Sequence, residues 1–295
     1  GDIVQPDYEN NRQDTGTCFA LAERVGKGMS PEYKANDDII LKIENVNRTY
    51  IDEDDNQVEA LQDINLSVRR GEFLSIIGSS GCGKTTLLRL IAGLDKPETG
   101  RLILDGEIIS GPDPQRGYVF QQGGLFQWLT VEKNIATGLK ARGVYKKNKE
   151  LVNQYINLVG LKGFEKAYPH QISGGMAQRV AIARALINNP KVLLLDEPMG
   201  ALDSFTRADI QDKLLELHRK NNTTMILVTH DVDEAIYLSD RIVIMTPRPG
   251  KISEIMEVRL SHPRDRGSAL FLAIRKEILE KFHLASALPQ PEYTI

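Results

Sequence analysis

Short apolar runs separated by longer mixed segments dominate the chain from about residue 70 onward. The runs are FLSII from Phe73, YVF from Tyr118, VLLL from Val192, MILV from Met225 and RIVIM from Arg241. They are apolar throughout rather than alternating, which is typical of strands covered on both faces in a parallel sheet. The pattern therefore predicts an α/β fold built on a central parallel sheet.

A different pattern precedes these runs. Segments 39–46 and 60–68 alternate in part between apolar and polar residues, and the acidic stretch IDEDDNQ lies between them. Alternating segments on either side of a polar turn are typical of a hairpin. We predict two antiparallel strands here.

Helical patterns fill the space between residues 121 and 190, where the strand signal disappears. Segments 131–138, 148–158 and 174–187 have helical composition, and they predict a helical insertion into the sheet at about 123–180. A last helix is predicted over 268–283, whose apolar residues recur at helical spacing: Leu270, Phe271, Ile274, Ile278, Leu279 and Phe282. We interpret it as packing on the body of the protein, with a partner surface as the alternative.

The boundaries of these patterns predict three parts. Residues 1–38 are polar and irregular, and we expect an extension that is disordered or a tether, with a short helix over 18–25 as an alternative. The main domain covers 39–259, and a helical tail covers 260–295.

Composition narrows the class of protein. The 37 basic and 40 acidic residues nearly balance, which argues against a chain built mainly to bind nucleic acid. No apolar run approaches the roughly 18 residues that cross a bilayer, so work at a membrane requires docking on a partner. The start of the chain has no secretory pattern, and the two cysteines, Cys18 and Cys82, suit a reducing cytosol.

Polar residues follow four of the apolar runs directly. FLSII leads into GSSGCGKTT, YVF into Gln121, VLLL into Asp196 and Glu197, and MILV into Thr229 and His230. Ligands of open α/β sheets bind beyond the carboxyl ends of the strands. We therefore expect these groups to meet at one edge of the sheet.

The glycine-rich loop over 78–85 fits G-x-x-x-x-G-K-[ST], the P-loop pattern. Its glycines let backbone N–H groups approach phosphate oxygens, and the following helix points its positive end at the same anion. Lys84 suits the outer phosphates and the Thr85 hydroxyl suits Mg²⁺; an unrelated glycine turn is the alternative. The predicted nucleotide-binding residues here are Gly78, Ser79, Ser80, Gly81, Cys82, Gly83, Lys84, Thr85 and Thr86.

The carboxylates and the imidazole suggest hydrolysis. Asp196 suits Mg²⁺, usually through water, and Glu197 could deprotonate or orient an attacking water. His230 could contact the γ-phosphate. Taken singly, Asp196 could be a turn or helix cap and His230 a structural hydrogen-bonding group.

The segment ISGGMAQR, residues 172–179, resembles the LSGGQ-x-QR signature of ATP-binding cassette (ABC) ATPases. The P-loop, Gln121, the signature, DEP from Asp196, ALD from residue 201 and His230 follow in that family's order, and the resemblance covers 39 to about 259. It implies a P-loop NTPase with a RecA-like core, an antiparallel β subdomain and an α-helical subdomain, which binds ATP and Mg²⁺.

The resemblance also implies a dimer, of two copies or of this chain and a homologue, that sandwiches two ATP molecules head to tail. Ser173, Gly174 and Gly175 of one subunit would meet the γ-phosphate on the other, and Asp203 would couple the two sites. Gln121 would sense Mg²⁺ and the attacking water. Tyr50 matches the aromatic residue that stacks on adenine, and a core tyrosine at a strand end is the alternative.

Met176, LFQWLTVEKNI, MTPRPGKI and HPRDR resemble the ATPases of nitrate, bicarbonate, sulfonate and taurine importers, although Ile172 and Phe126-Gln127 differ from their usual forms. That likeness implies a peripheral subunit on the cytoplasmic face of the cell membrane. Its partners would be permease subunits and, indirectly, an extracytoplasmic binding protein. Trp128 and Leu129 would line the permease groove.

Three alternatives stay open from the sequence. The chain could be the ATPase of an exporter or lipid transporter. It could be a soluble ABC ATPase that moves or clamps nucleic acid or ribosomes, although such proteins generally carry two cassettes or a long insertion. A P-loop kinase is the third alternative, but the signature has no role there. No nucleic-acid partner is expected.

Overall fold

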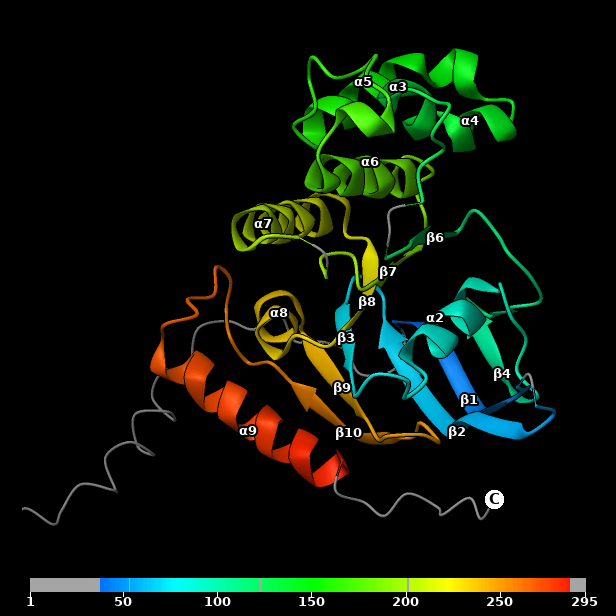
Figure 1. Cartoon of the computed structure of the whole chain (residues 1–295), viewed down its shortest axis with the longest axis vertical. Helices are drawn as coiled ribbons and strands as arrows, with labels where there is room; N and C mark the ends of the chain where they lie inside the picture. The colour runs from blue at the N-terminus through cyan, green and yellow to red at the C-terminus, as the bar shows by residue number, and fades with distance from the viewer. Residues whose placement is uncertain (1–37, 53, 122–123, 201, 287–295) are drawn as a thin grey trace, which may run out of the picture. The chain divides into compact units, whose positions relative to one another are not determined.

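The computed structural model describes residues 38–52, 54–121, 124–200 and 202–286, all of them in the compact unit that begins at Asp38 (Figure 1). The extension predicted over 1–38, with its short helix over 18–25, lies outside the described residues except for Asp38.

The core is a six-stranded sheet in the order β10-β9-β3-β8-β7-β6. Its strands are β3 (Phe73–Ile77), β6 (Arg116–Val119), β7 (Val192–Asp196), β8 (Thr224–Thr229), β9 (Arg241–Met245) and β10 (Ile252–Glu257). The five apolar runs form β3 and β6 to β9, and these strands pair in parallel, which confirms the predicted α/β fold. Strand β10 was not predicted; it pairs antiparallel with β9 at the edge.

A second sheet has four antiparallel strands in the order β2-β1-β4-β5. They are β1 (Ile39–Ile51), β2 (Gln57–Arg69), β4 (Thr99–Leu104) and β5 (Glu107–Ile108). The predicted hairpin is present but longer, because pairing continues to Ile51 opposite Gln57 through half-buried and exposed residues that carry little hydrophobic signal. This extension carries Tyr50 toward the glycine-rich loop.

Helices cover both faces of the six-stranded sheet, which explains why β3, β7 and β8 are buried throughout. On one face, α2 (Lys84–Ala92) shares a core with both sheets through Leu87, Leu88 and Ile91. The other face is covered by α7 (Ser204–Asn221), α8 (Val232–Leu238) and α9 (Ala269–Ser286). Side chains of β3 divide between the faces, with Leu74 on the α2 side and Ile77 on the α8 side.

The helical insertion contains α3 (Val131–Ile135), α4 (Thr137–Ala141), α5 (Lys149–Leu158) and α6 (Gly174–Leu186), with 3₁₀ turns η1 (Tyr145–Asn148) and η2 (Pro169–Gln171). These helices gather beside α7 and β6 (Figure 1). The helical composition predicted over 131–138 is confirmed, but the segment forms parts of two helices that divide at Ala136, where ψ is −8°. The Thr137 hydroxyl donates to the Lys133 carbonyl at 3.0 Å, a back-bond that bends helices.

Helix α9 packs on the body, as the sequence indicates. Phe271, Ile278 and Ala285 are buried against residues of α8 and β9. Leu270 was counted in the predicted apolar face, but its side chain is 65% exposed because it lies at the start of the helix, beside the buried Phe271.

Candidate functional site

The glycine-rich loop lies between β3 and α2 and depends on two close approaches. A Cβ atom at Gly83, whose φ is +99°, would lie 2.7 Å from the Ala60 carbonyl oxygen. A Cβ atom at Gly78 would lie 2.5 Å from the Cys82 sulfur. Glycine is therefore required at Gly83, where the loop packs against β2, and at Gly78, where it packs against the Cys82 side chain of the same loop.

Lys84 begins α2 and folds back over the loop. Its side chain is buried, and Nζ donates to the carbonyl oxygens of Gly78 at 2.9 Å and Ser79 at 3.0 Å. Burial raises the pKa of the neighbouring Cys82 thiol, so this small side chain stays neutral beneath the loop. The ammonium group is thus held next to the loop backbone, where an anion would meet it.

An open cavity of about 410 Å³ joins this loop to residues from four other segments. It is lined by Tyr50, Val58, Ala60, Ser80, Gly81, Gly83, Lys84, Thr85, Thr86, Gln121, Glu197 and Arg248. The antiparallel sheet contributes Tyr50, while Gln121 and Glu197 follow β6 and β7. The convergence expected at the carboxyl ends of the strands is therefore present.

Asp196 is the last residue of β7, and both of its carboxylate oxygens are engaged. The Thr85 hydroxyl donates to Oδ1 at 3.0 Å, and the Tyr118 hydroxyl donates to Oδ2 at 2.8 Å. Burial and the nearby Asp196 charge raise the pKa of Tyr118 well above its usual range, so Tyr118 stays a donor.

The donors at Asp196 suit Mg²⁺. A carboxylate and a hydroxyl are hard oxygen ligands, and Mg²⁺ bound with a nucleotide takes few protein ligands beside phosphate and water. Within the ranges that the structure describes, no group of three or more His, Cys, Asp or Glu residues is placed to hold a metal by itself.

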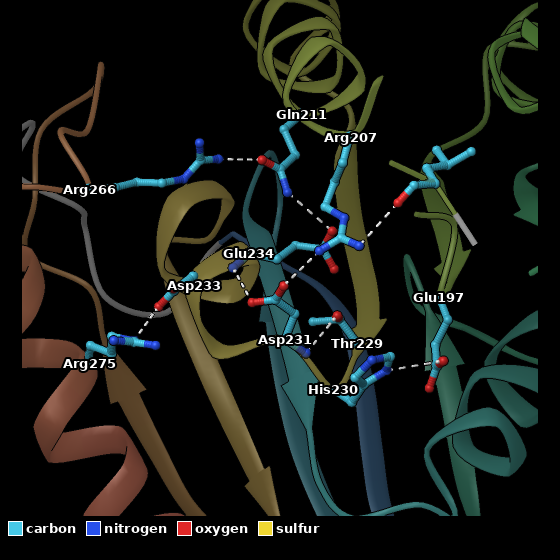
Figure 2. Close-up of polar contacts among 11 residues, drawn as sticks. Glu197, Arg207, Gln211, Thr229, His230, Asp231, Asp233, Glu234, Arg266 and Arg275 are labelled. Carbon is cyan, nitrogen blue, oxygen red and sulfur yellow. Dashed lines mark hydrogen bonds and ion pairs between the residues drawn. The ribbon is translucent and has the colours of Figure 1, made fainter. Parts of the chain in front are cut away.

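Two further side chains contact the Glu197 carboxylate. Gln121 Nε2 donates to Glu197 Oε2 at 3.3 Å. His230 Nδ1 lies 3.3 Å from the same oxygen, a contact drawn in Figure 2. The Glu197 side chain is 22% exposed, whereas that of His230 is 65% exposed. Glu197 lines the cavity, and the exposed His230 contacts it from outside that lining.

The backbone of Glu197 is left-handed, with φ of +43°. Residues other than glycine, asparagine and aspartate rarely adopt this conformation. Its N–H donates to the Val228 carbonyl at 2.9 Å, which ties it to β8. Such conformations persist where the surroundings fix them, and they cluster at active sites.

Tyr50 lies in the cavity wall but is also engaged elsewhere. Its hydroxyl donates to Asp95 Oδ2 at 2.6 Å, and the Arg48 guanidinium lies 4.4 Å from the ring centroid. The ring is half-buried. Its stacking on adenine stays a prediction.

The signature residues and Asp203 are not among the residues that line this cavity in the described chain. Ser173 caps α6 by accepting from the Met176 N–H at 3.2 Å, and Asp203 caps α7 by accepting from Phe205 and Thr206. Gly174 and Gly175 form the first turn of α6. Their predicted partner is the phosphate of a second subunit, so this separation is compatible with the prediction.

Two site residues were not predicted from the sequence. Arg248 lines the cavity and donates to the Gly81 carbonyl at 3.2 Å, although its segment MTPRPGKI had been singled out only for a family likeness. Tyr118 was read as part of an apolar strand, which hid its hydroxyl. No residue-level signal distinguished it from a core tyrosine.

None of the helices that the structure describes is both long and apolar enough to cross a bilayer.

Comparison with known proteins gives a consistent result. The family model described as ABC transporter matches residues 61–200. The chain is 52% identical over 233 residues to an aliphatic sulfonates import ATP-binding protein, SsuB, of Bacillus cereus, covering 79% of this chain and 92% of that relative. It is 46% identical over 249 residues to the bicarbonate transport ATP-binding protein CmpC of Synechococcus elongatus, covering 82% of this chain and 38% of that protein.

Solved structures agree on the fold. The dimeric ATP-binding cassette MJ0796, bound to ADP and phosphate in a post-hydrolysis state, is 34% identical with a TM-score of 0.66, covering 75% of this chain and 100% of that one. The cassette cbiO1 of Clostridium perfringens, part of an ABC transporter complex, is 29% identical with a TM-score of 0.68, covering 84% of this chain and 96% of that one.

Proposed function

This chain belongs to the ABC transporter family, and from that premise we propose that it is the ATP-binding and ATP-hydrolysing subunit of a bacterial importer for a small anion. The observation that carries the proposal is that Lys84, Gln121 and Glu197 line one cavity. Asp196 bonds to Thr85 and His230 contacts Glu197, each at the edge of that lining. In this proposal the ATP-binding domain covers residues 39–259.

ATP binds with its phosphates over the glycine-rich loop. Backbone N–H groups of 78–85 and the Lys84 ammonium contact the phosphate oxygens, and Lys84 gives up its bonds to the loop carbonyls to do so. Arg248 adds a second positive charge at the cavity wall. Tyr50 stacks on the adenine.

Thr85 and Asp196 hold Mg²⁺, since they supply the hydroxyl and carboxylate oxygens this ion prefers. When bound, the ion neutralises charge on the phosphates. Tyr118 keeps Asp196 oriented through its hydroxyl.

Glu197 acts on the attacking water. Its carboxylate accepts a proton as the water oxygen bonds to the γ-phosphorus, and the bond from that phosphorus to the bridging β–γ oxygen breaks to give ADP and phosphate. Gln121 and His230 both contact Glu197 at Oε2 and thereby orient its carboxylate. His230 also contacts the γ-phosphate.

A second ATP-binding subunit completes each site. Ser173, Gly174 and Gly175 offer a hydroxyl, an open backbone and the N-terminus of the 13-residue helix α6 to the γ-phosphate of the partner subunit. Asp203 couples the two sites. The dimeric state of the related cassette MJ0796 supports this arrangement.

The permease contact involves Trp128. Its side chain is 73% exposed, and the rings of Phe126 and Trp128 lie 5.4 Å apart, so together they offer an apolar surface. The subunit would then sit at the cytoplasmic face of the cell membrane. An extracytoplasmic binding protein would deliver the solute.

The test is to isolate the native complex, identify its membrane subunits and reconstitute it in liposomes. We expect ATP-dependent uptake of an alkanesulfonate or of bicarbonate, the anions named for the relatives, and loss of uptake with Glu197→Gln. Movement of lipid or export of solute would contradict the importer proposal.

A further inference from the structure

A chain of polar contacts runs from the C-terminal segment to the residues that flank His230 (Figure 2). Arg266 donates to Gln211 Oε1, and Gln211 Nε2 donates to Glu234 Oε1 at 3.2 Å. The Glu234 backbone N–H donates to Asp231 Oδ1 at 3.1 Å, and the Asp231 N–H donates to Thr229 Oγ1 at 3.1 Å. Thr229 directly precedes His230.

The inner members of this chain are buried. Gln211, Glu234 and Thr229 are each at most 4% exposed. Burial raises the pKa of Glu234, as expected for a carboxyl removed from water. Gln211 uses both ends of its amide, so its orientation is fixed only while Arg266 and Glu234 are both in place. Buried polar groups are costly unless all are paired, and when paired they fix one geometry.

The residue after His230 is held as firmly as the residue before it. Asp231 caps α8, accepting from the Glu234 N–H at 3.1 Å, and its own N–H donates to Thr229 Oγ1 at 3.1 Å. Arg207 donates to Asp231 Oδ2 and to the Leu202 carbonyl, both at 3.2 Å. Hydrogen bonds therefore fix both chain neighbours of His230, Thr229 and Asp231.

The C-terminal segment holds α8 at further points. Arg264 is buried and donates to the carbonyls of Ile236 and Ser239 at the end of α8. Arg275 Nε lies 2.7 Å from Asp233 Oδ1. The Arg266 guanidinium lies 4.0 Å from the centroid of the Tyr237 ring. Three arginines of the tail thus contact the helix that follows His230.

We propose that the tail over 260–286 is a positioning element for His230, and that Arg266 acts as a positioning residue through Gln211 and Glu234. The inference rests on the proposed function, because it assumes that the His230–Glu197 pair serves ATP hydrolysis. Arg266 touches neither the cavity nor that pair. Its influence on hydrolysis is indirect.

The experiment replaces Arg266 and follows two signals in the full chain. Arg266 is exposed, so Arg266→Ala should fold. We expect kcat for ATP to fall about tenfold, the scale of one lost charge-assisted hydrogen bond, while KM and nucleotide affinity stay unchanged. Arg266→Lys, which keeps the charge but not the fork, should recover part of the rate.

The second signal is the His230 imidazole resonance in nucleotide-free protein, assigned by its loss in His230→Ala. We expect Arg266→Ala and Gln211→Leu to shift it alike, and the double variant to add little to either single change. Arg259→Ala is the control, because this 87% exposed side chain in the same stretch pairs only with Glu257 among the described residues. It should change neither signal.

Different results would contradict the positioning proposal and the proposed function. If Arg266→Ala lowers thermal stability but leaves both kcat and the His230 resonance at parent values, Arg266 is structural and the positioning proposal is wrong. If the resonance moves in Arg266→Ala while the parent protein hydrolyses no ATP, the proposed function fails and the positioning of His230 by the tail stands.

Discussion

At the scale of single residues, the backbone of Glu197 is the most informative feature. A left-handed glutamate costs on the order of 1–3 kcal/mol, so its surroundings must hold it in place. The bond to Val228 and the two contacts at Oε2 do so. The carboxylate is therefore fixed at the cavity before a ligand arrives.

Glu197→Gln should remove proton acceptance while keeping size and hydrogen-bonding reach. We expect kcat for ATP to fall by about 10²-fold or more, with ATP affinity unchanged and a stable dimer trapped by ATP. Steady-state kinetics, nucleotide binding and sedimentation would measure these three properties.

Glu216→Gln is the matched control, because Glu216 is an exposed glutamate on α7 that pairs with Lys213. Lys84→Ala should instead weaken ATP binding itself. Hydrolysis by Glu197→Gln at the parent rate would rule out the role given to Glu197.

At the scale of elements, the start of α6 fits closely against α7. A Cβ atom at Gly175 would lie 2.2 Å from Thr206 Cγ2, whereas one at Gly174 would lie 3.9 Å from its nearest neighbour, Leu202 Cδ2. Thr206 cannot easily move, because its hydroxyl donates to Asp203 Oδ2 at 2.6 Å.

Gly175→Ala should therefore destabilise the nucleotide-free protein by about 1–3 kcal/mol, a typical cost of overpacking. Gly174→Ala should not, since alanine favours a helix and meets only ordinary contact there. Thermal unfolding would compare them. Adding Thr206→Ser, which removes Cγ2 but keeps the hydroxyl, should restore stability; no recovery would place the strain elsewhere.

Much of this level of structure could be predicted from the sequence. The five apolar strands, and the polar residues after four of them, were found because buried parallel strands carry an unbroken hydrophobic signal. The bounds of helix α7 were not predicted, since most of its 18 residues are polar and its buried apolar side chains begin only at Ile210. Strand β4 opens with the exposed residues Thr99 and Gly100 and was missed for a similar reason.

The finer parts of the site could not be predicted. The bond from Tyr118 to Asp196 joins residues 78 apart in the chain, and that from Arg266 to Gln211 joins residues 55 apart. Of these four residues, only Asp196 has a distinctive local pattern. Such contacts depend on the packing of several elements, which no short segment encodes.

At the scale of the whole molecule, assembly depends on surfaces away from the cavity. Trp128→Ala should weaken binding to the permease or lower transport per ATP, because it removes the most exposed part of the aromatic surface. Nucleotide binding should be unchanged. Pull-down of the membrane subunits and coupled transport assays would measure the effect.

Ile108→Ala provides the comparison for Trp128→Ala, since Ile108 is 64% exposed on β5 and should leave the complex intact. A Trp128→Ala protein that lost ATP binding would contradict a role limited to docking.

Stability should depend on pH through His262. Burial, followed by nearby positive charge, lowers the pKa of His262 to about 4 in the folded protein, whereas an unfolded histidine titrates near about 6.5. As pH falls through this window the unfolded state takes up the proton first, so the free energy of unfolding should decrease.

His262→Gln should make that decrease shallower, as measured by chemical denaturation at pH values from about 7 to about 4. His283→Gln, at an exposed position on α9, should leave the slope unchanged. Equal slopes for all three proteins would show that His262 does not carry the effect.

The helical insertion leaves the sheet after β6 and returns at β7, and these two strands are neighbours. The insertion therefore begins at the carboxyl end of β6 and ends at the amino end of β7, and these two attachments define a line along the strands. At the second attachment the Lys191 N–H donates to the Gln115 carbonyl at 2.8 Å. A pivot of the insertion about that line would leave the ladders of the sheet intact. Gln121 follows β6 near the first attachment, so under the proposed function a pull on the insertion would reach Glu197 through the Gln121 amide.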